Sequence, residues 1–286
     1  MQRAVIIPVP TGAAPLWRKV RAGVIDLHCH VLAGIDDGPD TIEGSVAMAR
    51  VAADLGTRTI VATPHVSFRY PNDSETIERL VRETNAALVD AGVALNVVAG
   101  AEVAMSQAAD LDPEELTALS LGDGPWLLIE CPFTSVAIGL DTLVRELEEE
   151  GRRIVLAHPE RCPAFQRDPE MLESLVQGGV LTSITAGSLV GRFGGTVKRF
   201  AFELLEAEVV HNVASDAHDP EQRRPGMAEE LRQAGLNGLV EWLTDAVPSA
   251  LLAGEESLPP RPQLDFAGVG ARRESWWRRG PLRRAS

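Results

Sequence analysis

Residues 24–30 read VIDLHCH, and this stretch decides the fold. It is almost continuously apolar up to its end, which is typical of a strand buried on both faces of a sheet. His28 and His30 stand two positions apart, so on a strand both imidazoles point to the same face. The stretch therefore predicts a buried strand that carries polar groups at its carboxyl end.

Six further runs of this kind follow, and helix-like segments separate most of them. The other predicted strands are 57–65, 95–103, 126–132, 153–160, 181–187 and 211–218, and the predicted helices are 41–55, 74–91, 139–150, 169–177, 196–208, 227–234 and 237–244. Asp40 is the expected N-cap of the first helix. Alternation of strands and helices predicts a mostly parallel sheet with helices outside. Seven units favour a barrel, although an open doubly wound sheet also fits.

The length of 286 residues suits one large α/β domain with short extensions. We expect an N-terminal extension at 1–23, a domain at 24–252, and a Pro/Gly-rich, basic tail at 253–286 with little order of its own. The sequence has no run of about 18 uncharged apolar residues, which argues against a transmembrane helix.

Composition limits the partners and the compartment. The net charge of −14 argues against nucleic acid as the main partner, because a phosphate backbone selects basic surfaces. Three cysteines are too few for a disulfide scaffold and predict a reducing, cytoplasmic setting.

Imidazoles and carboxylates recur at the carboxyl ends of the predicted strands. They are His28, His30, His65, Glu102, Glu130, His158, Asp216 and His218. In a barrel these ends meet at one mouth. Facing carboxylates would repel one another unless positive charge lay among them, and divalent ions supply that charge. Imidazole and carboxylate together suit Zn, Mn or Fe. Eight ligands exceed what one ion accepts, so we expect two or three ions.

The loop after His30 offers a ninth ligand. It contains Asp36 and Asp37, followed by Gly38 and Pro39, which favour a turn. Either aspartate can fold back toward the strand end.

Arginines near the same strand ends indicate the substrate. Arg161 follows His158 by three residues, and Arg223 and Arg224 follow His218 by five and six. A guanidinium fork matches phosphate oxygens, so these side chains favour a phosphate ester over a neutral amide. We expect Asp216 to be available as a general acid. The Gly-rich segment 185–195 either walls the pocket or forms a plain loop.

Other phosphatase chemistries lack their motifs. No cysteine is followed six positions later by arginine, no Gly-Lys-Ser/Thr occurs, and no Gly-x-Ser-x-Gly occurs. The sequence therefore argues against a cysteine nucleophile and lacks a P-loop and a serine elbow.

Together these motifs resemble the polymerase-and-histidinol-phosphatase (PHP) superfamily, and within it the metal-dependent protein tyrosine phosphatases of bacterial capsule and exopolysaccharide loci. The motifs are DLHCH at 26–30, DDGP at 36–39, TPH at 63–65, GAE at 100–102, LIE at 128–130, AHPER at 157–161, AGSLVGRFG at 186–194 and ASDAH at 214–218. The resemblance covers roughly residues 24–250. It implies a distorted seven-stranded (β/α) TIM-like barrel with two or three divalent metals, Mn most often, with Fe, Zn or Co as alternatives.

The resemblance also implies hydrolysis of phosphotyrosine, typically on a bacterial tyrosine kinase that controls polysaccharide export. It implies that Arg161 and one of Arg223 and Arg224 hold the phosphate. The implied metal ligands are His28, His30, Asp36 or Asp37, His65, Glu102, Glu130, His158, Asp216 and His218. Two alternatives stay open: another PHP enzyme, such as a histidinol-phosphate phosphatase or a phosphodiesterase, and a non-catalytic scaffold that binds the kinase. The basic tail, which contains Trp276 and Trp277, could contact a membrane or the kinase.

Overall fold

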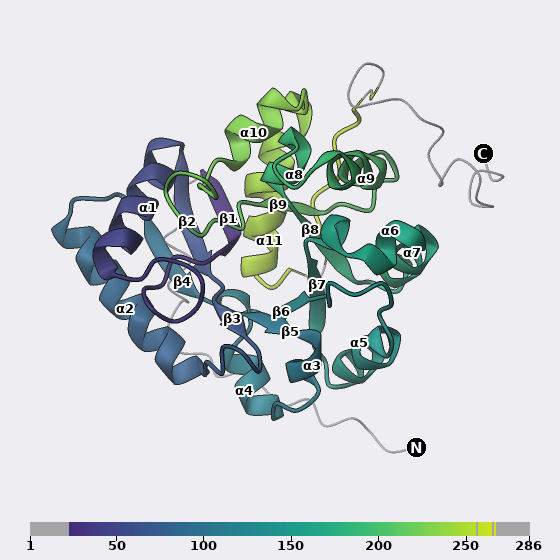
Figure 1. The fold of residues 1–286 in the computed structure, drawn as a ribbon, viewed down its shortest axis with the longest axis horizontal. Helices are drawn as coiled ribbons and strands as arrows, with labels where there is room; N and C mark the ends of the chain where they lie inside the picture. The colour runs from purple at the N-terminus through teal and green to yellow at the C-terminus, as the bar shows by residue number, and fades with distance from the viewer. Residues whose placement is uncertain (1–22, 256, 265, 267–286) are drawn as a thin grey trace.

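The computed structural model describes residues 23–255, 257–264 and 266. Its strands lie at the centre and its helices outside them (Figure 1). The strands are β1 Val24–Cys29, β2 Thr57–Ala62, β3 His65–Val66, β4 Asn96–Ala99, β5 Glu102–Ala104, β6 Trp126–Glu130, β7 Arg153–Ala157, β8 Leu181–Thr185 and β9 Asn212–Ala214.

The strands pair in parallel and form two sheets, with orders β1-β2-β4 and β3-β5-β6-β7-β8-β9. The prediction of a mixed α/β fold with parallel strands is confirmed. A single closed seven-stranded barrel is not what the strand pairing gives. Two hydrogen bonds join the end of β1, in the first sheet, to the segment that follows β9, in the second. The His30 N–H donates to the Ala217 carbonyl and the Asp216 N–H donates to the His28 carbonyl, both at 2.9 Å.

The two-sheet division arises where two predicted strands are interrupted. The predicted strand 57–65 breaks between β2 and β3 at Thr63-Pro64, where proline has no N–H to donate. The predicted strand 95–103 breaks between β4 and β5 at Gly100. A Cβ at Gly100 would lie 2.7 Å from Val61 Cγ1 and 3.2 Å from Leu121 Cδ2, so the neighbouring side chains leave no room for a side chain there.

Helices cover the outer faces of the sheets, with α1 and α2 on one side and α5, α6, α7 and α9 on the other (Figure 1). The helices are α1 Ile42–Asp54, α2 Ser74–Asp90, α3 Met105–Ala108, α4 Pro113–Ala118, α5 Leu140–Glu149, α6 Pro163–Arg167, α7 Pro169–Gln177, α8 Ala186–Val190, α9 Gly195–Glu206, α10 Met227–Gln233 and α11 Val247–Leu252. Short 3₁₀ turns occupy Leu121–Asp123, Pro159–Arg161 and Asn237–Leu239, and Trp242–Ala246 is a π-helix. The predicted helix 237–244 is thus a 3₁₀ turn followed by a π-helix.

The first helix begins at Ile42, one residue later than predicted. Its N-cap is Thr41 rather than Asp40, and the Thr41 hydroxyl accepts from the Gly44 N–H at 3.3 Å. Thr41 satisfies one of the free N–H groups of the first turn, which is what an N-cap does.

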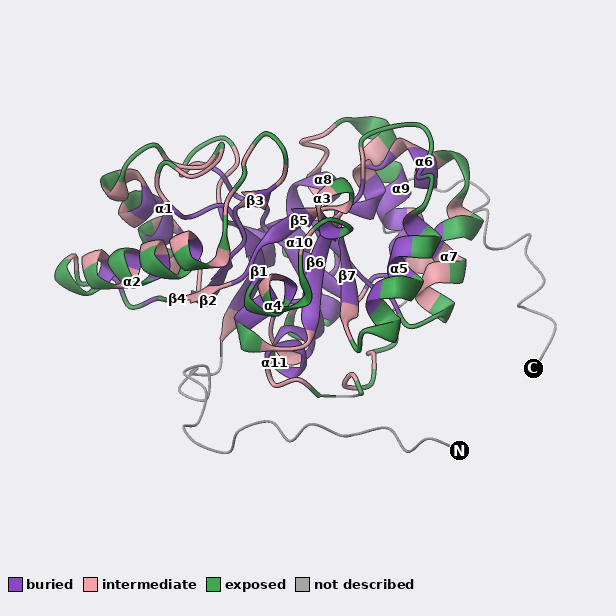
Figure 2. Cartoon of the chain, turned by 90° about the horizontal axis from the view of Figure 1, so that it is seen from below, coloured by how far each residue is buried: buried purple, intermediate pink, exposed green. Residues whose placement is uncertain are grey.

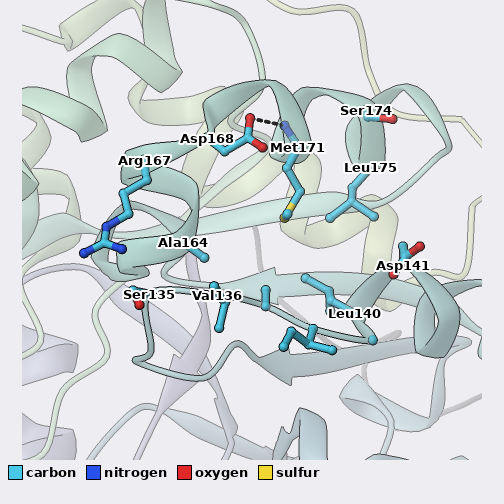
Figure 3. A pocket seen from close by; sticks show the side chains of 13 residues that line it. Ser135, Val136, Leu140, Asp141, Ala164, Arg167, Asp168, Met171, Ser174 and Leu175 are labelled. Atoms are coloured by element: carbon cyan, nitrogen blue, oxygen red, sulfur yellow. Dashed lines mark hydrogen bonds between the residues drawn. The ribbon is translucent and has the colours of Figure 1, made fainter.

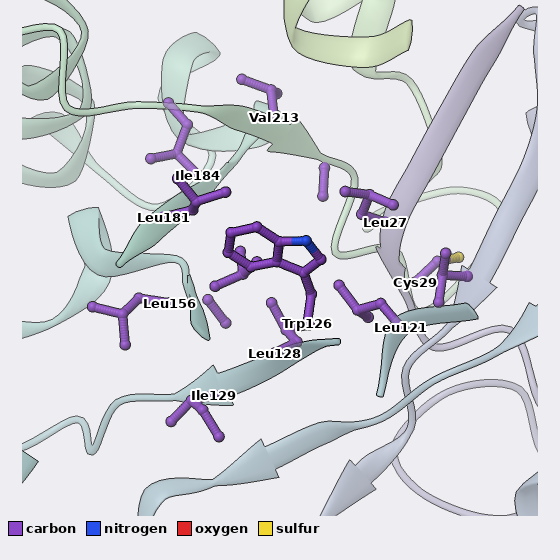
Figure 4. Close-up of a cluster of buried hydrophobic side chains, with 14 of the residues drawn as sticks. Leu27, Cys29, Leu121, Trp126, Leu128, Ile129, Leu156, Leu181, Ile184 and Val213 are labelled. Atoms are coloured by element: carbon purple, nitrogen blue, oxygen red, sulfur yellow. The ribbon is translucent and has the colours of Figure 1, made fainter. Parts of the chain in front are cut away.

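The strands are buried and the helices expose only their outer faces (Figure 2). Between the strands, Trp126 packs among Leu121, Leu128 and Leu181, each 8% exposed or less (Figure 4). Because this interior is apolar, the polar side chains of the strands gather at the strand ends.

Part of the expected tail packs on the domain. The Trp242 Nε1–H donates to the Pro259 carbonyl at 3.0 Å, and Arg261 donates to the Leu205 carbonyl at 2.9 Å. Residues 1–22 and 267–286, which hold most of both predicted extensions, lie outside the described residues. Among the described residues, no helix is long and apolar enough to cross a membrane.

Candidate metal centre

The predicted strand-end residues come together at one end of the sheets. His28, His65, Glu102 and Glu130 belong to β1, β3, β5 and β6, and His158, Asp216 and His218 follow β7 and β9. Six members of the cluster are 6% exposed or less: His28, His30, Glu102, His158, Asp216 and His218. Buried imidazoles and carboxylates at this density need compensating charge.

Side-chain donors in this cluster fall into four overlapping groups, each with its nitrogen and oxygen atoms within 4.8 Å of one another. The groups are His30, Asp37, His65 and His218; His28, His30 and Asp216; His28, Glu102 and His158; and His65, Glu102 and Glu130. His28, His30, His65 and Glu102 each belong to two groups. Of these four, Glu102 has two carboxylate oxygens and so can bridge adjacent ions, whereas each imidazole nitrogen can bind only one ion.

Glu102 lies at the centre of the cluster. Its Oε1 is 2.7 Å from His158 Nε2, and its Oε2 is 3.0 Å from His65 Nδ1, 3.3 Å from His28 Nε2 and 3.4 Å from His30 Nε2. Oε2 is buried and has no hydrogen-bond partner. A buried carboxylate oxygen without a partner is costly, and a cation among these nitrogens would satisfy it.

Electrostatics favour positive charge at this point. Burial opposes ionisation of Glu102, but the neighbouring His28 and His158 hold the pKa of its carboxyl well below the usual range. Burial likewise opposes protonation of His30, but Asp36 and Glu102 outweigh it and raise the pKa of His30 to about 10. The residues present therefore fit bound cations.

The two candidate aspartates have different neighbours. Asp36 Oδ2 lies 2.7 Å from His30 Nδ1, and Asp36 also accepts from the His65 and Gly38 N–H groups at 3.1 and 2.8 Å. Asp37 Oδ1 instead lies 3.2 Å from His218 Nε2 and 3.5 Å from His65 Nε2. Asp37 therefore belongs to one of the four donor groups. Asp36 instead contacts Nδ1 of His30, the ring nitrogen on the side away from Glu102.

Asp216 joins the cluster to two arginines. Its Oδ2 accepts from Arg161 at 2.6 Å and from Arg223 at 2.7 Å, and its Oδ1 lies 3.6 Å from the Nε2 atoms of His28 and His30. Burial opposes its ionisation, but His28 and Arg223 hold the pKa of Asp216 well below the usual range. Arg224 instead pairs with Glu229 at 2.8 Å.

Backbone conformation helps to aim two of these groups. His158 has φ +33° and Asp216 has φ +50°, in the left-handed region that residues other than glycine rarely adopt. Such conformations persist where the surrounding structure enforces them, often at functional sites. They turn the chain sharply just after β7 and β9.

Sequence reasoning missed several residues around the cluster. Phe133 stacks on His158 with centroids 5.4 Å apart, and Tyr70 stacks on His65 at 5.6 Å. The guanidinium of Arg161 lies 5.1 Å from the Phe133 centroid and 4.4 Å from that of Phe193. The sequence signals are weak: Tyr70 and Phe133 lie in loops that follow strand ends, and Phe193 lies in the 186–194 motif, after α8.

Two buried carboxyl groups, Asp26 and Glu160, fix the backbone next to the cluster. Asp26 accepts from the Ser215 N–H at 3.0 Å, which ties β1 to the turn before Asp216. Glu160 accepts from the Thr185 N–H at 3.0 Å and the Ser188 hydroxyl at 2.6 Å, which fixes the start of α8. The segment 185–195 is thus a helix and a turn rather than a plain loop.

Two cavities of about 550 Å³ each lie at the surface. One is lined by Asp37, His218 and Arg223 and opens at the cluster. The other is lined mainly by apolar residues of 135–141 and 164–175, without any of the cluster residues (Figure 3). Of these two cavities, the first gives access to the cluster, on the side of Asp37 and His218.

Parallel strands with imidazoles and carboxylates gathered beyond their carboxyl ends define the class of metal-dependent hydrolases. Residues 24–235 match the family model described as capsular polysaccharide synthesis, CpsB/CapC. The chain belongs to the CpsB/CapC family.

Known relatives agree with this assignment. The chain is 38% identical to the tyrosine-protein phosphatase YwqE of Bacillus subtilis over 73% of this chain and 82% of that protein. It matches a solved structure from work on YwqE and on CpsB from Streptococcus pneumoniae, described as unique metal-dependent tyrosine phosphatases, with a TM-score of 0.74, 34% identity and coverage of 84% and 100%. An amidohydrolase from Mycoplasma synoviae matches with a TM-score of 0.54 at 12% identity, over 87% and 92% of the two chains, which shows a shared fold only.

Proposed function

We propose that this protein is a metal-dependent protein tyrosine phosphatase. One observation carries the proposal: Asp216 contacts the imidazole cluster through Oδ1 and two arginines through Oδ2. Cations and guanidinium groups side by side suit a phosphate ester, whose oxygens need both. Membership of the CpsB/CapC family and similarity to YwqE support phosphotyrosine as the substrate.

The proposed metal ligands are the nine residues of the four donor groups: His28, His30, Asp37, His65, Glu102, Glu130, His158, Asp216 and His218. We assign Asp36 to holding His30 in place, because a carboxylate on the second imidazole nitrogen fixes the orientation of a metal ligand. Nine donors suit two or three divalent ions, and we favour Mn, with Fe, Zn or Co as alternatives.

The bound ions would activate a water molecule and neutralise the charge on the phosphoryl oxygens. Arg161 and Arg223 are 18% and 29% exposed, so their guanidinium groups face both the cluster and the entering phosphate. We propose that both orient the phosphate oxygens, and that Arg224 does not. Asp216 is ionised and so is better suited to hold metal and arginine than to donate a proton. A phenolate leaving group, with a pKa near ~10, needs little acid assistance.

The wider setting is also part of the proposal. We propose that the physiological substrate is a bacterial tyrosine kinase of capsule or exopolysaccharide synthesis, and that the basic tail contacts it or a membrane. Free thiols at all three cysteines support a cytoplasmic setting. We further propose one domain at 24–252, in which the hydrogen bonds from β1 to 216–217 join the two sheets into a distorted seven-stranded barrel.

A direct assay tests the proposed activity. Protein depleted of metal and then reloaded with Mn²⁺ is offered a phosphotyrosine peptide and, separately, histidinol phosphate and a phosphodiester. We expect turnover of the peptide only. Preferential turnover of histidinol phosphate or of the diester would make this a different PHP enzyme, and metal binding without any turnover would favour the scaffold.

A further inference from the structure

Aromatic side chains are scarce in this chain, and three of them, Tyr70, Phe133 and Phe193, contact a cluster imidazole or Arg161. The sequence has seven phenylalanines and one tyrosine. Phe165, Phe200 and Phe202 are buried in the core, each 5% exposed or less. By contrast, the tyrosine and three other phenylalanines lie in the loops that follow β3, β6 and α8: Phe68, Tyr70, Phe133 and Phe193.

Phe133 is the ring most exposed among those that contact the cluster. It lies three residues after Glu130, between β6 and α5, and is 51% exposed. Its ring is nearly parallel to that of His158, with an interplanar angle of 18°. A phenylalanine kept half in water gives up much of the stability that burial would provide, so the position suits a ring that is covered when a ligand binds.

Phe133 also lies beside the group that would hold the phosphate. The Arg161 guanidinium contacts Asp216 at 2.6 Å and lies between Phe133 and Phe193, 5.1 and 4.4 Å from their centroids. In an aryl phosphate the ring is one ester oxygen away from phosphorus. If Arg161 holds the phosphate, the ring of the ligand must therefore lie within reach of Phe133.

We propose that Phe133 and Phe193 form an aryl subsite, which binds the aromatic ring of an aryl phosphate and so selects aryl over alkyl phosphate esters. The proposal rests on the proposed phosphatase function and names the residues that determine its substrate specificity. Stacked or edge-on ring contacts stabilise such a complex beyond simple area burial. An alkyl phosphate would reach the same arginine and metals but would leave the two rings uncovered.

Binding of two unreactive phosphonates separates ring recognition from leaving-group chemistry. Isothermal titration calorimetry compares benzylphosphonate, in which CH₂ replaces the ester oxygen, with methylphosphonate on the Mn²⁺-loaded protein. We expect the wild type to bind benzylphosphonate more tightly, and Phe133→Leu to weaken that binding about fivefold while methylphosphonate affinity is unchanged. Phe133→Tyr keeps a ring and should keep the preference. Phe68→Leu, the same substitution at a 73% exposed position, should change neither affinity.

Two results would overturn the aryl subsite. Equal weakening of both phosphonates by Phe133→Leu would mean that the ring only positions Arg161, and no change in either would mean that Phe133 does not contact the ligand. Phosphotyrosine turnover by the wild type, measured in parallel, tests the proposed function separately. If turnover is normal but Phe133→Leu has no effect on benzylphosphonate binding, the subsite is wrong and the phosphatase function stands.

Discussion

Asp36 and His30 face each other with Oδ2 and Nδ1 2.7 Å apart, while Nε2 of His30 is directed at Glu102. The carboxylate thus fixes both the orientation and the tautomer of an imidazole whose other nitrogen enters the cluster. Two neighbouring aspartates that are equivalent in the sequence have different roles as a result: Asp36 lies behind the cluster and Asp37 lies in it.

Asp36→Asn should weaken metal binding without removing a ligand. The amide still fits the space but orients His30 less firmly, so we expect about a 10- to 100-fold loss of Mn²⁺ affinity. Competition with a chelating dye measures it. Asp37→Asn removes a proposed ligand and should reduce the number of bound ions. The same loss of bound ions from both variants would contradict the separate roles.

Arg161→Lys and Arg223→Lys should each reduce kcat/KM for a phosphotyrosine peptide by about 100-fold, because an ammonium group cannot replace a guanidinium fork on phosphate oxygens. Arg224→Lys is the matched control. It should retain wild-type kinetics, since Arg224 pairs with Glu229. A large loss in Arg224→Lys together with normal kinetics in Arg223→Lys would reverse the assignment.

His211 should make the free energy of unfolding depend on pH. Burial, reinforced by Arg261, lowers the pKa of His211 to about 4 from 6.5. The folded state therefore favours the neutral ring, so its stabilising effect is complete above pH 6.5 and is lost as the pH falls toward 4. The loss reaches at most about 3 kcal/mol.

His211→Asn should flatten that pH dependence, although it also disturbs the hydrogen bond that the Thr182 N–H donates to Nδ1. Urea unfolding of chelated wild type and variant between pH 4 and 7 isolates the difference. Parallel stability curves for the two proteins would show that His211 does not titrate in this way.

Leu156→Ala should destabilise the fold by about 2–5 kcal/mol, because Leu156 is fully buried in the core and a cavity would remain. Val89→Ala, at a position 78% exposed on α2, should change stability by less than about 0.5 kcal/mol. Chemical denaturation of both variants checks this. Similar effects at both positions would be incompatible with the described core.

Much of the fold and of the cluster could be predicted from local sequence. The apolar run before His28 predicts a buried strand, and the place of Glu102 and His158 at strand ends predicts that they meet. The interruption at Gly100 depends on the neighbouring Val61 and Leu121 side chains, and periodicity alone could not locate it or the break at Pro64. The roles of Asp36 and Asp37, or of Arg223 and Arg224, depend on contacts with His30, Asp216 and Glu229.

The aromatic contacts were beyond sequence reasoning for the same reason. Phe133 and Tyr70 are in loops of no regular period, and only the folded chain brings their rings onto His158 and His65. A strand or helix pattern predicts where an element lies, but it does not predict which way a loop side chain turns.

Metal content and phosphotyrosine turnover, measured together on the same sample before chelation, after chelation and after reloading with Mn²⁺, test the central claim most directly. The account predicts two or three ions per chain, loss of turnover when they are removed, recovery when they return, and fewer ions in Glu102→Ala. Unchanged turnover by a protein free of metal would contradict it.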